Sequence, residues 1–111
     1  MIRAKFYTKN DSIHMSLKGH AGAAPIGEDL ICAGATMMAY TVAQAVQFMH
    51  DAGKLKKRPK ISLKGGNADI VVTPREEDYA EALHTFYVAQ CGMHLLAHNY
   101  PEHVKLEHLT V

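Results

Sequence analysis

A chain of 111 residues has the size of one domain, 1–111, and its 48% hydrophobic content is ordinary for a protein with a buried core. The net charge of +1 gives no electrostatic reason to expect nucleic acid or an anionic membrane as the main partner. Two cysteines, Cys32 and Cys91, are too few for a secreted disulfide framework, and the first residues lack a signal-peptide pattern, so we expect a cytoplasmic protein.

The first thirty residues predict a β-hairpin followed by a loop. Apolar and polar residues alternate through residues 2–9 and again through residues 13–17, which is the pattern of two half-buried strands. The residues "NDS" at 10–12 have turn chemistry. Residues 19–28 contain three glycines and a proline without periodicity, which predicts a loop.

A long helix is predicted next, from about Asp29 to Ala52, with Asp29 as its N-cap and Gly53 at its end. The twenty residues from Leu30 to Met49 carry no formal charge, which is long enough to span a bilayer. Five of the twenty are alanine and several others are Thr or Gln, so we expect a buried helix of a globular domain and no membrane partner.

Two short strands and a second helix follow. The strands are expected at about 61–63 and 68–73, joined by a turn in which Gly65 and Gly66 supply positive φ values. The second helix is expected to start at Pro74, with three acidic residues in its first turn and a mostly apolar stripe along one side. The stripe consists of Tyr79, Leu83, Phe86, Gln90, Met93, Ala97 and Tyr100.

The final segment, 103–111, is a possible fifth strand. The order strand-strand-helix-strand-strand-helix-strand predicts an α+β fold with a mostly antiparallel sheet and two long helices packed on it. The first helix is apolar around most of its circumference, including Met37, Met38, Tyr40 and Met49. One sheet cannot cover such a surface, so we expect a homodimer.

The most informative stretch is "GHAGAAPIGEDLICAGA", residues 19–35. Cys32 is expected in the first turn of the helix, where unpaired N–H groups and the helix dipole favour a thiolate and can stabilise an oxyanion. His20, at the end of the second strand, can accept a proton from the thiol and return it to a leaving amine. Asp29 caps the helix or orients His20, and an inert, buried Cys32 is the alternative.

This stretch resembles the ribosomal-processing cysteine protease family, Prp. The family signature is Gly-His-Ala at a strand end, then Gly-x-Asp, two aliphatic residues and Cys-Ala-Gly or Cys-Ala-Ala. The corresponding residues here are Gly19, His20, Ala21, Gly27, Asp29, Leu30, Ile31, Cys32, Ala33 and Gly34. The resemblance extends to Gly65-Gly66, to the length and to the order of elements, while Thr36 stands where some relatives have serine.

The resemblance implies a dimeric cysteine protease without a cofactor. Its substrate would be the N-terminal leader of a large-subunit ribosomal protein, the one numbered twenty-seven, cut after a pair of aromatic residues. Cys32 falls on the nucleophile of the family and His20 on its histidine. The supporting residues implied by the motif are Asp29, Gly19, Ala21, Gly27, Ala33 and Thr36.

Two other features favour different functions. The basic run at 54–60, "KLKKRPK", is typical of a solvated loop, or of the RNA contact of a non-enzymatic ribosome-assembly module in which Cys32 is inert. Four residues of the second helix lie in one arc with a spacing compatible with zinc: His84, Cys91, His94 and His98. Because one helix rarely closes a tetrahedral site unaided, we expect no metal.

Overall fold

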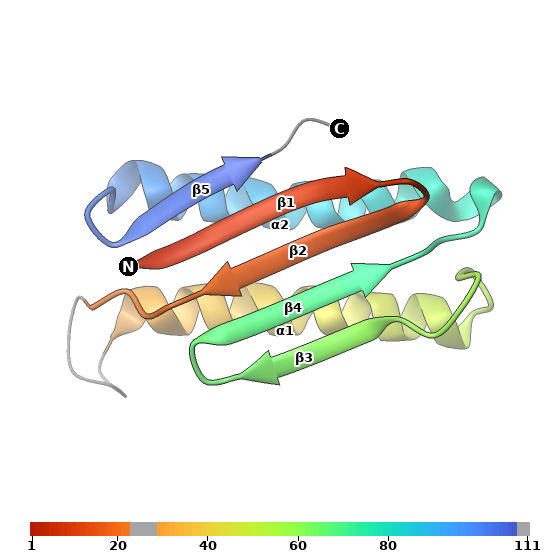
Figure 1. Cartoon of the computed structure of the whole chain (residues 1–111), viewed down its shortest axis with the longest axis horizontal. Helices are drawn as coiled ribbons and strands as arrows, with labels where there is room; N and C mark the ends of the chain where they lie inside the picture. Colours follow the sequence, from red (N-terminus) through yellow and green to blue (C-terminus); the bar gives the residue numbers. More distant parts are fainter. Residues whose placement is uncertain (23–28, 109–111) are drawn as a thin grey trace.

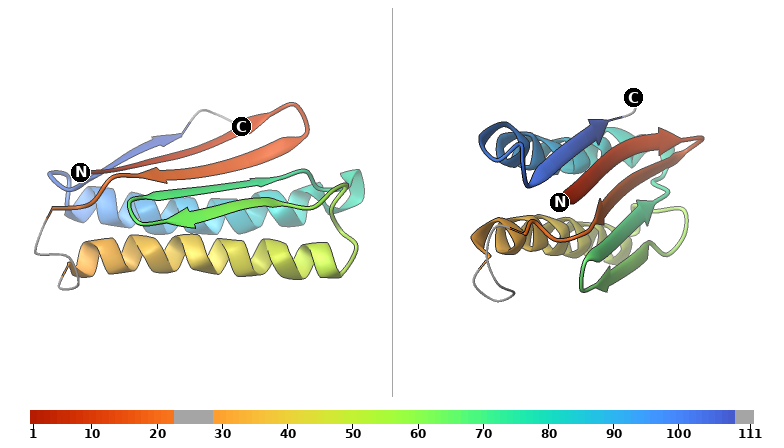
Figure 2. Two further views of the ribbon diagram at one scale, coloured as in Figure 1. Left: turned by 60° about the horizontal axis from the view of Figure 1, so that its bottom comes forward. Right: turned by 60° about the vertical axis from the view of Figure 1, so that its left-hand side comes forward.

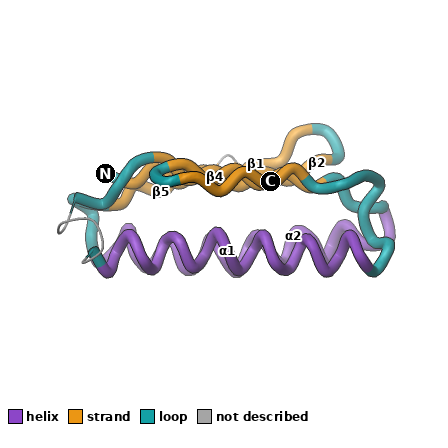
Figure 3. The backbone as a smooth tube through the Cα atoms, turned by 90° about the horizontal axis from the view of Figure 1, so that it is seen from below, coloured by secondary structure: helices purple, strands orange, loops and turns teal. Residues whose placement is uncertain are grey.

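The computed structural model describes residues 1–22 and 29–108. These residues form two layers, a five-stranded sheet and two long helices that lie on the same face of it (Figure 3). The α+β class and the order of elements expected from the sequence are confirmed. The strands are β1 (Ile2–Lys9), β2 (Ser12–Lys18), β3 (Lys60–Lys64), β4 (Asn67–Val72) and β5 (Val104–His108), and the helices are α1 (Leu30–Asp51) and α2 (Tyr79–Asn99).

The strands are arranged in the order β3-β4-β2-β1-β5 (Figure 1). The pairs β1–β2, β2–β4 and β3–β4 are antiparallel, whereas β1 and β5 are parallel, with Ile2 opposite Val104. The first and last strands therefore lie side by side at one side of the sheet, and β3 is the edge strand on the other side. The sequence predicted the strands but not this order.

Two tight turns close the hairpins. The β1–β2 turn consists of Asn10 and Asp11, and Asn10 adopts φ +57°, a left-handed conformation that asparagine tolerates. In the β3–β4 turn only Gly66 has a positive φ, at +70°. The expectation of positive φ at both glycines is thus wrong for Gly65.

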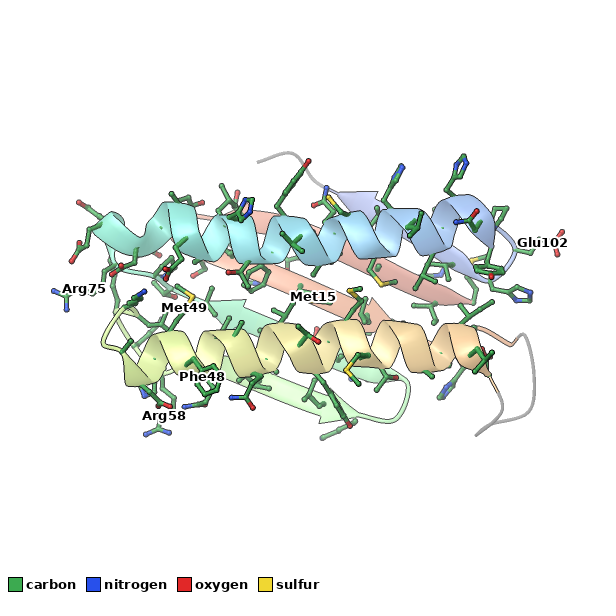
Figure 4. The ribbon with its side chains drawn as sticks, turned by 180° about the vertical axis from the view of Figure 1, so that it is seen from behind. Met15, Phe48, Met49, Arg58, Arg75 and Glu102 are labelled. Atoms are coloured by element: carbon green, nitrogen blue, oxygen red, sulfur yellow. The ribbon has the colours of Figure 1, made fainter. Side chains whose placement is uncertain are left out.

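Helix α1 packs one side on the sheet and leaves the other side exposed. Met49 is buried and points toward α2, whereas Phe48 is 64% exposed on the opposite side (Figure 4). By length and composition α1 could cross a membrane (22 residues, mean hydropathy 1.2), but the core helix of a globular protein passes the same test. Its buried residues pack into the core: Ile31, Ala35, Ala39, Val42, Ala43, Val46 and Met49.

Helix α2 begins later than the sequence predicted. Pro74 forms an isolated antiparallel bridge with Leu55, so the chain is still extended there, and the acidic residues form a 3-10 turn at Glu76–Asp78 before the helix starts at Tyr79. The apolar stripe predicted along α2 is only partly the face that packs into the core. Phe86 and Met93 are buried, but the centre of the contact also includes Ala82 and Ala89, and the far end of the stripe at Tyr100 is exposed.

The two faces of the sheet differ in chemistry. The face toward the helices carries the apolar residues of each strand, and both views in Figure 2 show the helices on this side only. The loop end of β2 and the N-terminal end of α1 lie at the same end of the molecule (Figure 1). This arrangement brings the His20 segment and the first turn of α1 together.

Candidate active site

Asp29 starts α1 and fixes the position of Cys32. Its carboxylate accepts hydrogen bonds from the N–H groups of Ile31 (3.0 Å) and Cys32 (2.9 Å), which makes it the expected N-cap. Cys32 is consequently half-buried in the first turn, near the positive end of the helix dipole. The expectation that these N–H groups stabilise an oxyanion is wrong for both residues, because each group already donates to Asp29.

His20 follows β2 and lies beside Cys32. Its Nδ1 atom is 4.0 Å from the Cys32 Sγ atom, the outer limit of a hydrogen bond to sulfur, and its side chain is exposed. Catalytic hydrogen bonds are often long in the absence of substrate and shorten when substrate binds. The geometry therefore allows a proton to pass between the thiol and the imidazole.

Gly66 makes room for the His20 ring. A Cβ atom built at Gly66 would lie only 2.7 Å from His20 Nε2, so any side chain there would displace the imidazole. The Gly66 carbonyl also accepts a hydrogen bond from the Gly19 N–H at 2.8 Å, which ties the turn of the β3–β4 hairpin to the end of β2. The sequence predicted Gly66 as a turn residue and as part of the family resemblance, but it gave no signal of the contact with His20.

Ala21 contacts the sulfur through its backbone. Its N–H donates to Cys32 Sγ at 3.3 Å, and its carbonyl accepts a hydrogen bond from His103 Nδ1 at 2.8 Å. A donor directed at the sulfur favours the anionic form of a thiol. His103, in the segment before β5, holds the peptide group that supplies this donor. No sequence signal pointed to His103, which is 82 residues from Ala21.

Gly19 allows the chain to turn from β2 into the site. It adopts φ +93°, and a Cβ atom there would clash with the carbonyl oxygen of Met1. A residue with a side chain would thus be strained twice, by its backbone conformation and by this contact. Among the predicted supporting residues, Gly19 and Ala21 act through the backbone.

An open cavity of about 510 Å³ starts at Cys32 and His20. It extends between the N-terminal half of α1 and the β3–β4 hairpin, where Tyr40 and Leu63 line it. A second cavity, of about 280 Å³, shares Tyr40 and Leu63 and extends the depression to Gln47. Together the two cavities form a groove, which follows α1 for roughly 20 Å at 1.5 Å per residue.

The remaining predicted residues have different positions. Ala33 and Thr36 are exposed and line the groove beside Cys32. Gly27 lies outside the described residues, as does most of the loop that contains it.

Within 1–22 and 29–108, no group of three or more His, Cys, Asp or Glu residues could hold a metal ion. Among His84, Cys91, His94 and His98, the described contact is a stacking of the His94 and His98 rings, whose centroids are 6.3 Å apart.

A thiol and an imidazole at the end of an open groove, with a main-chain N–H directed at the sulfur, are the components of a cysteine hydrolase. The family model for cysteine protease Prp matches residues 1–105. The chain belongs to the Prp family of cysteine proteases, as the resemblance in its sequence predicted. Among curated proteins, none matches the chain.

Solved structures share the fold. The essential ribosomal processing protease Prp of S. aureus, in complex with a covalently linked product peptide, is 19% identical, with a TM-score of 0.73, covering 98% of this chain and 100% of that one. A Streptococcus mutans protein, SMU.848, is 22% identical, with a TM-score of 0.71, covering 100% of this chain and 96% of that one. The S. aureus protease with a substrate peptide is 17% identical, with a TM-score of 0.69 and coverages of 98% and 100%.

Proposed function

We propose that this protein is a ribosomal-processing endopeptidase that uses Cys32 as nucleophile and His20 as general acid and base. Its substrate is the N-terminal leader of the large-subunit ribosomal protein numbered twenty-seven, cut after a pair of aromatic residues, in the cytoplasm. The observation that carries the proposal is the 4.0 Å contact between Cys32 Sγ and His20 Nδ1 at the end of a groove. The S. aureus relatives, described as ribosomal processing proteases with bound peptides, support the choice of substrate.

The groove suits an extended peptide. Edge strand β3 forms one wall of it through Leu63 and Lys64, and a peptide can add to such an edge by main-chain hydrogen bonds while its side chains alternate between the groove and solvent. Tyr40 is 53% exposed and Leu63 is 36% exposed. These two apolar side chains give the aromatic pair of the substrate a surface against which to bury.

The first half of the reaction forms a thioester. His20 takes the thiol proton, the Cys32 sulfur attacks the scissile carbonyl carbon, and a C–S bond forms. The charge moves from the sulfur to the carbonyl oxygen, and the Ala21 N–H, 3.3 Å from the sulfur, is in position to follow it. The imidazolium then protonates the departing amine as the C–N bond breaks.

The second half restores the enzyme. A water molecule loses its proton to His20 and attacks the thioester carbon. The C–S bond breaks and the leader leaves with a new carboxylate, while the proton on His20 returns the Cys32 thiol to its starting state. No cofactor or external reductant enters this cycle. Cys32 is a free thiol, as the mechanism requires, and so is Cys91.

Cleavage of two synthetic peptides tests this function. One peptide copies the leader and the following residues, and the other has alanines in place of the aromatic pair; products are identified by mass spectrometry. Wild type should cut the first peptide after the aromatic pair and the second at least tenfold more slowly. Cys32→Ser should cut neither, while the matched variant Cys91→Ser should behave as wild type. Equal cleavage of the two peptides, or activity in Cys32→Ser, would refute the proposal.

We also propose that the protein acts as a homodimer through the outer surface of the helices. Met38 and Met49 are covered within the chain, but other large apolar side chains remain exposed on both helices. Apart from Tyr40 in the groove, they are Leu30, Met37 and Phe48 on α1 and Tyr87, Val88 and Leu95 on α2. Light scattering at micromolar concentration should report twice the 12.2 kDa of one chain. A monomer at that concentration would contradict this assembly.

A further inference from the structure

The face of the sheet opposite the helices is strongly basic, although the whole chain has a net charge of only +1. Side chains alternate along each strand, so the register identifies the residues on this face. Seven of them are cationic and two are acidic. The cations are Arg3, Lys5, Lys9, Lys18, Lys60, Lys64 and Lys105, and the acids are Asp69 and Glu107.

Both acids on this face already have partners. Asp69 pairs with Lys18 at 2.7 Å, and Glu107 pairs with Lys5 and Lys105, each at 3.8 Å. By contrast, Lys9 and Lys60 make no ion pair with any described residue. Arg3 and Lys64 are also unpaired among the described residues, so uncompensated positive charge lies at both ends of this face. At the end near the β1–β2 turn, the turn residue Asp11 is paired with Lys56, which leaves Lys9 and Lys60 without an acidic partner.

Two more cations join this end of the sheet from the loop between α1 and β3. Lys57 and Arg58 are exposed, and Figure 4 shows Arg58 projecting away from the helices at the β3 side. Lys9, Lys57, Arg58 and Lys60 all line one open cavity of about 200 Å³, together with His14. We call these four cations with Tyr7 and His14 the basic surface. It contains residues of the sequence run 54–60 that the protease mechanism does not use.

Two aromatic rings adjoin the cations of the basic surface. Tyr7 and His14 are opposite each other on β1 and β2, half-exposed, with ring centroids 4.4 Å apart and planes at 16°. Partial burial, and then the nearby ammonium groups of Lys9 and Lys60, lower the pKa of His14 below its usual value. The imidazole is consequently neutral at pH 7 and stacks as an uncharged ring. Lys60 and Val71 continue the same cross-strand row.

We propose that the basic surface binds single-stranded nucleic acid. Unpaired Lys and Arg side chains bind the phosphates, and the half-exposed rings of Tyr7 and His14 offer a base a stacking surface, which is how sheet proteins hold single strands without reading their sequence. An acidic peptide would satisfy the cations but would make no use of the rings. The low net charge of the chain conceals this surface because the acidic residues lie mainly elsewhere.

The basic surface is separate from the protease site. His20 follows the end of β2 at Lys18, and the basic surface adjoins its start at Ser12, about 20 Å away at the rise of a strand. The cavities at the two ends share no lining residue. Nucleic acid and peptide can therefore bind at the same time, and the proposal does not depend on the identity of the peptide substrate.

Fluorescence polarisation with a labelled 12-nucleotide oligouridine tests the proposal, with the salt concentration varied. Four phosphate contacts predict a slope of log K against log[salt] of roughly −3. The variant Lys9→Ala/Arg58→Ala/Lys60→Ala should bind at least about tenfold more weakly, with a slope closer to −1. The matched control Lys54→Ala/Arg75→Ala/Lys105→Ala removes the same charge from residues that are ion-paired, and should bind within about twofold of wild type.

Further measurements separate nucleic acid from other polyanions. Tyr7→Val should weaken oligouridine and oligothymidine binding several-fold and leave heparin binding unchanged. Saturating oligouridine should raise the pKa of His14 in NMR titrations, because the phosphates offset the field of Lys9 and Lys60.

The triple variant should be folded by circular dichroism and should still cut the leader peptide. Equal binding by the triple variant and wild type, an equal loss in the control, or polyglutamate binding as tight as oligouridine would overturn the proposal.

Discussion

The two cysteines of this protein have the same side chain and very different surroundings. Cys32 is half-buried in the first turn of α1, with the Ala21 N–H directed at its sulfur and the His20 imidazole 4.0 Å away. Cys91 is exposed in the middle of α2, where its neighbour is Tyr87. A side-chain hydrogen bond with Cys91 raises the pKa of Tyr87 above its usual value.

The difference between the cysteines lies in which segments reach them. Cys91 has a partner from its own helix, one turn away. Cys32 is contacted by the segment after β2, which is positioned in turn by Gly66 in the β3–β4 turn and by His103 before β5. In the proposed mechanism, the reactivity of Cys32 thus depends on tertiary structure, and substitutions distant in sequence are expected to abolish it. The following predictions test that statement, starting with the largest expected effect.

Gly66→Ala should lower the kcat/KM for leader cleavage by about 100-fold or more, because the new Cβ pushes His20 away from Cys32 and small displacements of catalytic groups cost this much. Gly53→Ala is the matched control. Gly53 has the similar φ of +74°, so the backbone strain is alike, but nothing lies within 4 Å of its Cβ position. Peptide cleavage and thermal unfolding are measured for both variants. Equal activities would mean that Gly66 serves the turn alone.

Iodoacetamide should alkylate Cys32 about tenfold faster than Cys91 at slightly acidic pH, since the Ala21 N–H, the helix dipole and His20 all favour a thiolate at Cys32. Mass spectrometry of tryptic peptides gives both rates in one sample. In His20→Ala the advantage of Cys32 should shrink, while the rate at Cys91 stays constant as an internal control. Equal rates at the two cysteines in the wild-type protein would contradict an activated Cys32.

His103→Leu should reduce kcat about fivefold with little change in KM, because the Ala21 peptide loses its anchor while the groove is untouched. His103→Asn should recover most of the activity, since an amide N–H can donate to the Ala21 carbonyl from a similar position. Steady-state kinetics on the leader peptide separate kcat from KM. If Leu and Asn at this position behave alike, the hydrogen bond has no part in positioning Ala21.

Asp29→Ala should lower the free energy of unfolding by about 1–2 kcal/mol, the usual cost of losing an N-cap side chain. Its matched control is Asp78→Ala at the N-cap of α2, where no side-chain capping bond forms, and the expected loss there is a few tenths of a kcal/mol. Urea denaturation of both variants supplies the two values. Equal losses would imply that the capping bonds of Asp29 contribute little to stability.

Local patterns predicted the elements of this fold well. The alternation of apolar residues predicted β1, β2 and β5, and the turn residues Gly65 and Gly66 marked the β3–β4 hairpin. Asp29 and Gly53 marked the ends of α1 to within a residue or two of Leu30–Asp51. The prediction that α2 starts at Pro74 was wrong, because a long-range bridge to Leu55 keeps the chain extended at that residue. The parallel pairing of β1 with β5 was equally hidden from sequence, since strands so far apart in the chain leave no local signal of their register.

Side-chain chemistry predicted the catalytic pair of the site, whereas Gly19 and Ala21, which act through the backbone, were predicted only through the family resemblance. Cys32 and His20 were found from their residue types and spacing, and the structure brings their side chains together. The contributions of Ala21, Gly66 and His103 depend on a main-chain N–H, a missing Cβ and a hydrogen bond across the fold. The positive charge on the sheet face opposite the helices was not predicted for another reason. The net charge of the whole chain does not show on which face of the sheet each charged side chain lies.

The parallel strand β5 has a consequence for the timing of activity during synthesis. Its pairing with β1 joins residues separated by almost the whole chain, and His103 reaches Ala21 only when this pairing is in place. A nascent chain that has exposed Cys32 and His20 but still holds residues 103–108 inside the ribosomal tunnel lacks that anchor. Cys32 is therefore expected to gain its full set of contacts only after β5 has left the ribosomal tunnel and paired with β1.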